Sequence, residues 1–288
     1  MIGSSFPWWL KILVKSGLSI FPLPYYKLRG LSGKKGSMVQ EDYAQSIFEK
    51  FMKEYRELME EEFKGNLLEL GAGGSLINGL YARKAGFDKC YFVDVVDYAS
   101  QEMGIYKKLI LELDEEDQNR FNNAYAESSD LNEAFRQIGI IYLTNGLESL
   151  RGIPSDSISY SFSNAVLEHV RIGEFAQTVA ELKRIHRADS ISLHQVDYKD
   201  HLASSLHSLR FSRKLWESRF FPNSGFYTNR LRNRDVIDFF VDGGFTVEEN
   251  RPEFWEKPPL AKNKLAREFQ DYDENELLIQ SGFIVFRA

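Results

Sequence analysis

The chain has 288 residues, a length that suits one α/β domain with additions. Hydrophobic residues make up 43% and charged residues 27%, which excludes a disordered chain. The net charge of −6 excludes a protein whose whole surface coats nucleic acid. The single cysteine, Cys90, excludes an intrachain disulfide and a cysteine metal site, and it favours a reducing cytoplasm.

Residues 1–36 are expected to form an amphipathic segment of their own, ahead of a domain over residues 37–288. The apolar run 6–26 is interrupted by two lysines and ended by two prolines, so it is too short and too broken for a transmembrane helix. No cleavage site follows it, which argues against a signal peptide. Two interpretations stay open: peripheral contact with the inner face of a membrane, which Trp8 and Trp9 would suit, and a helix that folds back as a lid.

From residue 37 onward, helical and strand periods alternate along the chain. Helices are expected up to residue 63 and then over 76–85, much of 99–138, 174–186 and 234–242. Short apolar runs predict seven strands, at 67–70, 89–94, 140–144, 157–162, 191–196, 245–249 and 282–287. Strands that alternate with helices predict a mostly parallel sheet with helices on both faces.

In two stretches the apolar residues follow neither the helical nor the strand spacing. Residues 198–232 follow the fifth expected strand, and residues 250–275 join the last two. A loop of this length inside a compact domain is usually functional. Residues 198–232 are therefore expected to form an insert on the substrate side of the domain.

A glycine-rich turn follows the first expected strand. Residues 69–74 read Glu-Leu-Gly-Ala-Gly-Gly, and a helix comes next. The glycines allow tight turning and close approach of a ligand, while the helix start offers unpaired N–H groups. Dinucleotide sites use the same geometry. However, a carboxylate at Glu69 would repel a pyrophosphate, and it suits a ligand with an ammonium group, such as the methionine end of S-adenosylmethionine.

Asp94 closes the second expected strand, at the position where an acidic residue hydrogen-bonds ribose hydroxyls. Asp97 is the alternative for that role. The structural alternatives are a local buried pairing for Glu69 and an ordinary helix cap for Asp94. Taken together, the glycine turn and the two acids favour a nucleoside cofactor that carries an amino acid.

At these residues the chain resembles class I S-adenosylmethionine-dependent methyltransferases. Residues 67–73, LLELGAG, look like their first motif. Residues 161–170, SFSNAVLEHV, look like the fourth-strand motif of the small-molecule branch, which includes ubiquinone-pathway and sugar methyltransferases. The resemblance spans about residues 64–197 and the final strands, and it implies a Rossmann-like sheet of seven strands with the last one antiparallel.

The resemblance also implies S-adenosylmethionine as cofactor and a role for individual residues. The residues concerned are Glu69, Gly71, Ala72, Gly73, Asp94, Asn145, Gly146, Leu147 and Asn164. The first four would hold the amino-acid end, Asp94 the ribose, the next three the adenine, and Asn164 would lie beside the sulfonium. The family often has an acidic residue at the adenine position, where this chain has Asn145. More distantly, residues 194–232 look like methyltransferases associated with bacterial polysaccharide assembly, which implies a glycan acceptor.

All five histidines lie within 39 residues, around the carboxyl ends of the fourth and fifth expected strands. Ligands bind at that edge of an open α/β sheet, and a neutral imidazole can take a proton from a hydroxyl or an amine. The candidates for catalysis are His169, His194, Asp197 and His201. Acid/base chemistry, a divalent metal and plain loop hydrogen bonding compete for this cluster. Because the spacing matches no zinc motif, no metal ligand is assigned.

Residues 202–234 contain seven cations and one anion. Arginine can grip a carboxylate or a phosphate, and aromatic residues lie among the cations. The substrate-binding candidates are Arg210, Arg213, Trp216, Tyr227 and Arg230. They predict an anionic acceptor such as a nucleotide-linked or acidic sugar, and the alternative is a cap whose aromatics form its own core. A nucleic-acid acceptor is disfavoured because no second basic region extends this group of cations along the surface.

The sequence therefore predicts methyl transfer from S-adenosylmethionine to an oxygen or nitrogen of a small molecule or glycan. Two alternatives stay open: an NAD-dependent oxidoreductase, and a non-catalytic cofactor-binding protein that serves as a partner in a complex.

Overall fold

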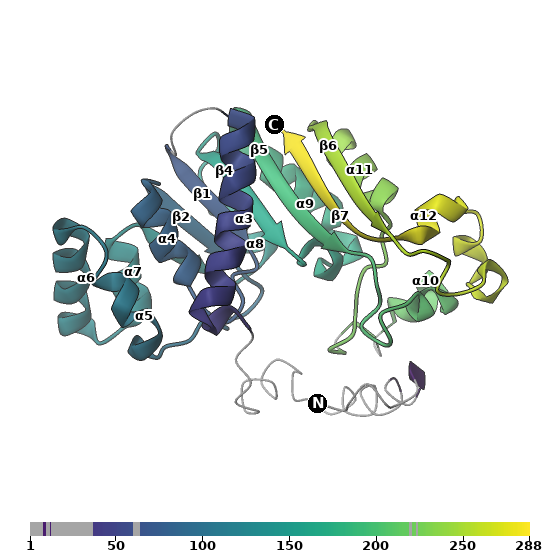
Figure 1. The fold of residues 1–288 in the computed structure, drawn as a ribbon, viewed down its shortest axis with the longest axis horizontal. Coiled ribbons are helices and arrows are strands. Elements are labelled where there is room, and N and C mark those ends of the chain that lie inside the picture. The colour runs from purple at the N-terminus through teal and green to yellow at the C-terminus, as the bar shows by residue number, and fades with distance from the viewer. Residues whose placement is uncertain (1–7, 10–11, 13–36, 60–63, 219–220, 223) are drawn as a thin grey trace.

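Seven strands form a single sheet in the order β3-β2-β1-β4-β5-β7-β6 (Figure 1). The computed structural model describes residues 8–9, 12, 37–59, 64–218, 221–222 and 224–288. The strands are β1 (Asn66–Leu70), β2 (Lys89–Val93), β3 (Ile140–Leu143), β4 (Ile158–Asn164), β5 (His186–Asp197), β6 (Thr246–Phe254) and β7 (Ile279–Arg287). The first five pair in parallel, whereas β7 is antiparallel to both β5 and β6.

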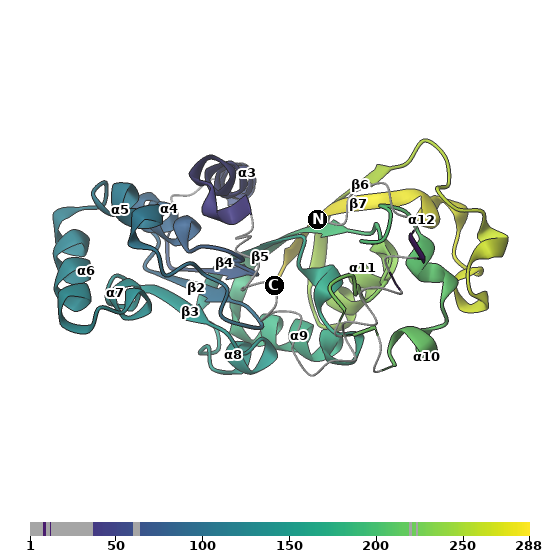
Figure 2. The ribbon, with the colours of Figure 1, turned by 90° about the horizontal axis from the view of Figure 1, so that it is seen from below.

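Helices cover both faces of this sheet (Figure 2). One face packs against α3 (Glu41–Met59), α4 (Ile77–Ala85), α5 (Met103–Ile110), α6 (Glu115–Ser128) and α7 (Leu131–Gln137). The other packs against α8 (Leu147–Arg151), α9 (Ile172–Ile185) and α11 (Asn233–Asp242). The expected Rossmann-like, seven-stranded, mostly parallel sheet is confirmed.

The last strands extend further than their apolar residues indicate. β6 runs to Phe254, and most of its side chains are exposed. Its backbone pairs with β7 along this whole length, from Thr246 to Phe254. An exposed edge strand needs few apolar residues, so its polar half gave no strand signal in the sequence.

The two stretches without a period pack against each other and beside the carboxyl end of β5. Leu206 and Leu209 of the insert share a buried cluster with Leu260, Leu265 and Phe269 of the second stretch and with Leu277, which follows it. A second cluster lies within the insert, around α10 (Arg213–Trp216), and consists of Leu202, Trp216, Phe221, Phe226 and Tyr227. A further short helix, α12 (Glu274–Leu278), precedes β7. The insert is therefore a small folded unit.

Trp8 and Ile12 pack against the second of these clusters. The remainder of the predicted segment 1–36, apart from Trp9, lies outside the described residues. Within the described part of the chain, no helix is long and apolar enough to cross a membrane.

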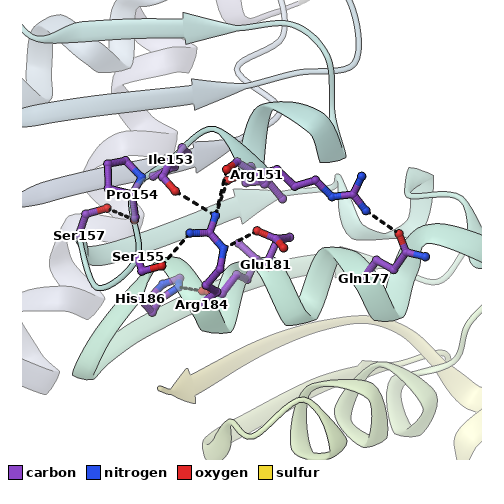
Figure 3. A network of polar contacts seen from close by, with 11 residues as sticks. Arg151, Ile153, Pro154, Ser155, Ser157, Gln177, Glu181, Arg184 and His186 are labelled. Carbon is purple, nitrogen blue, oxygen red and sulfur yellow. Dashed lines mark hydrogen bonds and ion pairs between the residues drawn. The ribbon is translucent and has the colours of Figure 1, made fainter.

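Arg184 joins α9 to the turn that precedes β4, at the amino end of the sheet (Figure 3). Its guanidinium donates to the carbonyls of Leu150 at 3.0 Å and Ile153 at 2.9 Å, and it pairs with Glu181 at 2.6 Å. These bonds satisfy carbonyls that the end of α8 leaves open. The network lies at the opposite end of the strands from the predicted site, and its role is structural.

Candidate functional site

The loops after β1, β2 and β3 are joined to one another at the carboxyl edge of the sheet. The Gly73 N–H donates to Oδ2 of Asp94 at 3.2 Å, and the Ser100 N–H donates to the Gly74 carbonyl at 2.9 Å. From the third loop, the Gly146 N–H donates to the Asp94 carbonyl at 2.8 Å. The structure therefore brings the predicted cofactor residues of three separate loops into one connected rim.

Gly71 occupies a position that only glycine fits well. Its φ is +77°, and a Cβ atom added there would overlap the side chain of Val166, which follows β4. The loop after β4 thus packs directly on the loop after β1. Ala72, the next residue, is buried.

Glu69 forms a buried acidic corner with Asn78 of α4. The carboxyl group is 3% exposed, and its two oxygens accept from Nδ2 of Asn78 at 3.1 and 3.0 Å. Burial raises the pKa of Glu69 to about 8, and the Asn78 hydrogen bond opposes that rise. Oδ1 of Asn78 has no hydrogen-bond partner among the described residues. The corner therefore offers acceptor atoms with no matching cation, which suits an ammonium ligand.

Asn78 was missed in the sequence analysis. The available signal was a polar residue in the first turn of the helix after the glycine turn. The alternative of a local buried pairing for Glu69 is thus also observed, since Asn78 supplies it.

Asp94 closes the cofactor loop from the side of β2. Its carboxylate accepts from the N–H groups of Val95 at 2.8 Å and Gly73 at 3.2 Å, and burial raises its pKa against these bonds. Val95 is 61% exposed, although it is apolar. A Cβ atom at Gly146 would lie 3.3 Å from Cγ1 of Val95, so the predicted adenine loop borders this exposed side chain. Val95 was also missed, and its signal was an apolar residue directly after the acid.

Three backbone N–H groups at the glycine turn and the start of α4 already have acceptors within the protein. The Gly73 N–H is used by Asp94, and the Leu76 N–H donates to the Tyr106 hydroxyl at 3.4 Å. The Ile77 N–H donates to Oγ of Ser75 at 3.5 Å. These three N–H groups are therefore not free to bind a phosphate in this arrangement.

Asn164 ends β4 on the same face of the sheet as Glu69. Glu69 pairs with Phe162, and Asn164 is the next residue of β4 on that face, opposite Gln195 of β5. Its side chain is partly buried. The predicted position beside the amino-acid end of the cofactor loop is consistent with this register.

His169 and His201, two of the predicted catalytic residues, meet across the insert boundary. Their Nε2 atoms are 3.2 Å apart and their rings stack with centroids 5.0 Å apart. Nδ1 of His169 lies 3.1 Å from the Tyr227 carbonyl. Because a carbonyl only accepts, a hydrogen bond to Tyr227 requires a proton on Nδ1 of His169, and the contact between the two Nε2 atoms requires a proton on one of them. Both side chains are exposed at the carboxyl edge of the sheet.

The structure corrects the prediction for His194. This residue is 0% exposed beneath α11, and its ring nitrogens bond to the hydroxyls of Ser163 at 2.7 Å and Ser192 at 2.8 Å. Ser192 continues to Ser161 and then to His186, which is also buried. Burial lowers the pKa of His194 to about 3 and of His186 to about 4. His194 is a neutral core residue and cannot reach an acceptor.

Asp197 does not form the expected carboxylate–imidazole pair in its described contacts. Its Oδ1 accepts from the Lys199 N–H at 2.9 Å and pairs with Nζ of Lys199 at 3.4 Å. The neighbouring Asp200 is buried and accepts from the N–H groups of Leu202 and Ala203 at the start of the insert. In the described part of the chain, no group of three or more His, Cys, Asp or Glu side chains could hold a metal ion.

Three of the five substrate-binding candidates belong to the core of the insert, as the alternative interpretation held. Trp216 is 0% exposed and donates to the Thr228 carbonyl at 2.8 Å, while Tyr227 is 6% exposed and donates to Glu217. Arg230 is 6% exposed, donates to two insert carbonyls and lies over the Trp216 ring at 5.0 Å. Aromatic packing and carbonyl capping explain these residues, and the prediction that they face a substrate is wrong.

Arg210 and Arg213 are more open. Arg210 lies over the Trp8 ring at 5.2 Å, and Nε of Arg210 donates to His207 at 3.2 Å. Arg213 lies over the Phe269 ring at 5.5 Å and its side chain is exposed. A substrate role for these two arginines stays a prediction.

Glu168 is a buried acid that the sequence analysis did not single out. It is 4% exposed, and the backbone N–H groups of Glu168 itself and of Asp197 lie near its carboxyl group without reaching good hydrogen-bond geometry. Burial raises its pKa to about 8, and the nearby charge of Asp197 adds to the rise. Its position between a leucine and a histidine gave no sign of this burial.

Comparison with known proteins relates this chain to others by fold. No family model and no curated protein matches it by sequence. Among solved structures, an S-adenosylmethionine-dependent methyltransferase from Mesorhizobium loti aligns at TM-score 0.46 and 12% identity, over 82% of this chain and 96% of the other. One from Archaeoglobus fulgidus aligns at TM-score 0.46 and 12% identity, over 92% and 100%. A putative sarcosine dimethylglycine methyltransferase from Galdieria sulphuraria aligns at TM-score 0.47 and 12% identity, over 84% and 85%.

Proposed function

We propose that this chain binds S-adenosylmethionine and transfers its methyl group to an oxygen or nitrogen of a small-molecule or glycan acceptor. The observation that carries the proposal is the buried corner of Glu69 and Asn78 beside the glycine loop. A cationic ligand would offset the burial that raises the pKa of Glu69, and it could also donate to Oδ1 of Asn78, which has no partner among the described residues. The ammonium of the methionine end is such a group. A carboxylate at Glu69 disfavours NAD because it would repel a pyrophosphate, and three N–H groups of the turn and helix start already have acceptors.

The remaining residues of the rim fit the nucleoside half of this cofactor. Asp94 lies across the loop from Glu69 and would accept from ribose hydroxyls, as Asp–ribose contacts do in related sheets. Val95 and Gly146 would border the adenine, with Asn145 and Leu147 on the same loop. Asn164 shares a face with Glu69 and would lie next to the sulfonium.

The bound cofactor supplies an electrophilic methyl group. The chain must then hold the acceptor in line with that group and remove a proton where the acceptor is a hydroxyl or an amine. We assign proton removal to the pair of His169 and His201, since the Tyr227 carbonyl fixes His169 and leaves its Nε2 directed at His201.

Only two side chains bear on the nature of the acceptor. Arg210 and Arg213 are the two predicted substrate residues that are not buried in the insert core, and they would favour an anionic group on a sugar. A role in polysaccharide biosynthesis, a cytoplasmic location and membrane contact through residues 6–26 are proposals that rest on the sequence.

Titration calorimetry tests cofactor binding directly. Wild-type protein is titrated with S-adenosylhomocysteine, S-adenosylmethionine and NAD under the same conditions. The proposal expects the first two to bind and NAD not to bind. Binding of NAD alone would establish the oxidoreductase alternative.

A second assay separates an enzyme from a non-catalytic binding partner. Protein that binds the cofactor is incubated with methyl-labelled S-adenosylmethionine and cell extract, and release of S-adenosylhomocysteine is followed. An H201A variant is the matched control, because His201 is exposed and lies outside the proposed cofactor residues. Binding without any release above extract that lacks the protein would leave the chain as a binding partner only, whereas equal release by H201A and wild type would contradict the catalytic role of His201.

A further inference from the structure

A tyrosine of β3 holds the loop that follows β2. The Tyr142 hydroxyl accepts from the N–H groups of Tyr98 at 2.9 Å and Ala99 at 3.3 Å, and it donates to the Val96 carbonyl at 3.2 Å. A phenolic hydroxyl has one proton and two lone pairs. The proton and both lone pairs of the Tyr142 hydroxyl therefore all form hydrogen bonds with the backbone of a single loop.

The Tyr142 side chain is buried, which shields its hydrogen bonds to the loop from water. Tyr142 is 9% exposed, and its ring belongs to the core on the face of the sheet that α4 and α7 cover. Burial raises the pKa of Tyr142, so the hydroxyl keeps its proton and continues to donate at neutral pH. The loop itself contains only bends and irregular backbone from residue 94 to 102, so few regular hydrogen bonds define its shape.

A second tyrosine fixes the far end of the same loop. The Tyr106 hydroxyl of α5 donates to the Ser100 carbonyl at 2.8 Å and accepts from the Leu76 N–H at 3.4 Å. Tyr106 is fully buried and burial raises its pKa to about 12. It thereby joins the end of this loop to the start of α4.

We propose that Tyr142 is a positioning residue for the nucleoside half of the cofactor, acting through the loop of residues 95–99. The inference rests on the proposed function. Tyr142 need not touch the ligand: it sets the backbone that carries the exposed side chain of Val95 and follows Asp94. A loop ordered before binding loses less conformational entropy when the ligand arrives, which increases affinity.

The Y142F variant isolates the hydroxyl, because the ring that packs in the core is kept. The substitution removes the acceptor used by the Tyr98 and Ala99 N–H groups and the donor used by Val96. Calorimetry compares S-adenosylhomocysteine with 5′-methylthioadenosine, which has the nucleoside but lacks the amino-acid end. We expect both dissociation constants to rise by a similar factor, about tenfold for the loss of one or two net hydrogen bonds.

Two control variants separate this effect from general damage. Y160F also removes a buried hydroxyl, whose partner is the Phe51 carbonyl of α3 at 2.8 Å, and should leave both dissociation constants unchanged. E69Q should weaken S-adenosylhomocysteine and spare 5′-methylthioadenosine. Unchanged affinities in Y142F, or a loss restricted to S-adenosylhomocysteine, would overturn the inference.

Wild-type protein provides a test that does not depend on the variant's folding. Hydrogen exchange of the Tyr98 and Ala99 amides is measured with and without 5′-methylthioadenosine. The inference expects these amides to exchange slowly in the free protein and to gain further protection on binding; fast exchange in the free protein would overturn it. If wild-type protein binds neither ligand while these amides are protected, the proposed function has failed and the loop geometry has not.

Discussion

At the scale of single residues, Asp94 is the most direct test of the cofactor site. We expect D94A to weaken S-adenosylhomocysteine binding by about 1–3 kcal/mol, because it removes hydrogen bonds to a charged acceptor. The Gly73 N–H also loses its partner in this variant. Calorimetry at pH 7 measures the change, with D97A as the matched control. A larger loss in D97A would transfer the ribose role to Asp97.

His194 and His201 give opposite expectations, although the sequence grouped them together. H194A should lower the free energy of unfolding by about 2–4 kcal/mol, because it leaves a cavity and removes a hydrogen-bond partner from the buried hydroxyls of Ser163 and Ser192. H201A should change stability by less than about 0.5 kcal/mol and should slow methyl release. Urea unfolding and the release assay measure the two effects. An H194A protein as stable as wild type would contradict the structural role.

At the scale of elements, the junction of β1 and α4 depends on one glycine. We expect G71A to destabilise the protein by about 1–3 kcal/mol and to weaken cofactor binding, because φ is +77° and the new methyl group overlaps Val166. G104A is the control, since a Cβ atom there meets no atom within 4 Å and the residue lies in α5. That control should stabilise the protein by about 0.5–1 kcal/mol. Equal urea midpoints for the two variants would refute the steric argument.

At the scale of the whole molecule, four buried titratable groups shape stability as a function of pH. The folded-state pKa values of Glu69 and Glu168 are raised to about 8, so their contribution is complete at acid pH and is lost as pH rises toward 8. The folded-state pKa values of His186 and His194 are lowered to about 4 and 3. The stability that these two histidines contribute is therefore present above their pKa in the unfolded chain and is lost as pH falls. The two pairs oppose each other between pH values of about 4.5 and 6.5, the unfolded pKa values of Glu and His.

Stability should therefore fall between pH values of about 6.5 and 8, where only the carboxyl groups still change. Each such group accounts for at most about 1.4 kcal/mol per pH unit. Urea unfolding across this range should show a shallower slope for E168Q than for wild type. Glu168 is the better choice for this test than Glu69, since it lies outside the proposed cofactor corner. Identical slopes would show that Glu168 is not held protonated by its burial.

The sequence by itself determined most of the helices and strands that build the sheet. Alternating periods depend on neighbours a few residues apart, so they can be recognised before the chain is folded. The glycine turn with Glu69, and Asp94 at the end of the next strand, were visible for the same reason. Each marks the end of a strand, and in a parallel sheet those ends meet at one edge.

Only the tertiary structure decided which side chains face that edge. A strand period assigns His194 to one face, but α11, some forty residues later, is what buries it. Arg230 and Trp216 became core residues because the insert folds on itself and on a distant loop. Asn78 donates a hydrogen bond to Glu69, 9 positions earlier, and the Tyr142 hydroxyl accepts one from Tyr98, 44 positions earlier. Such contacts arise from packing between elements, and no local pattern in the sequence specifies them.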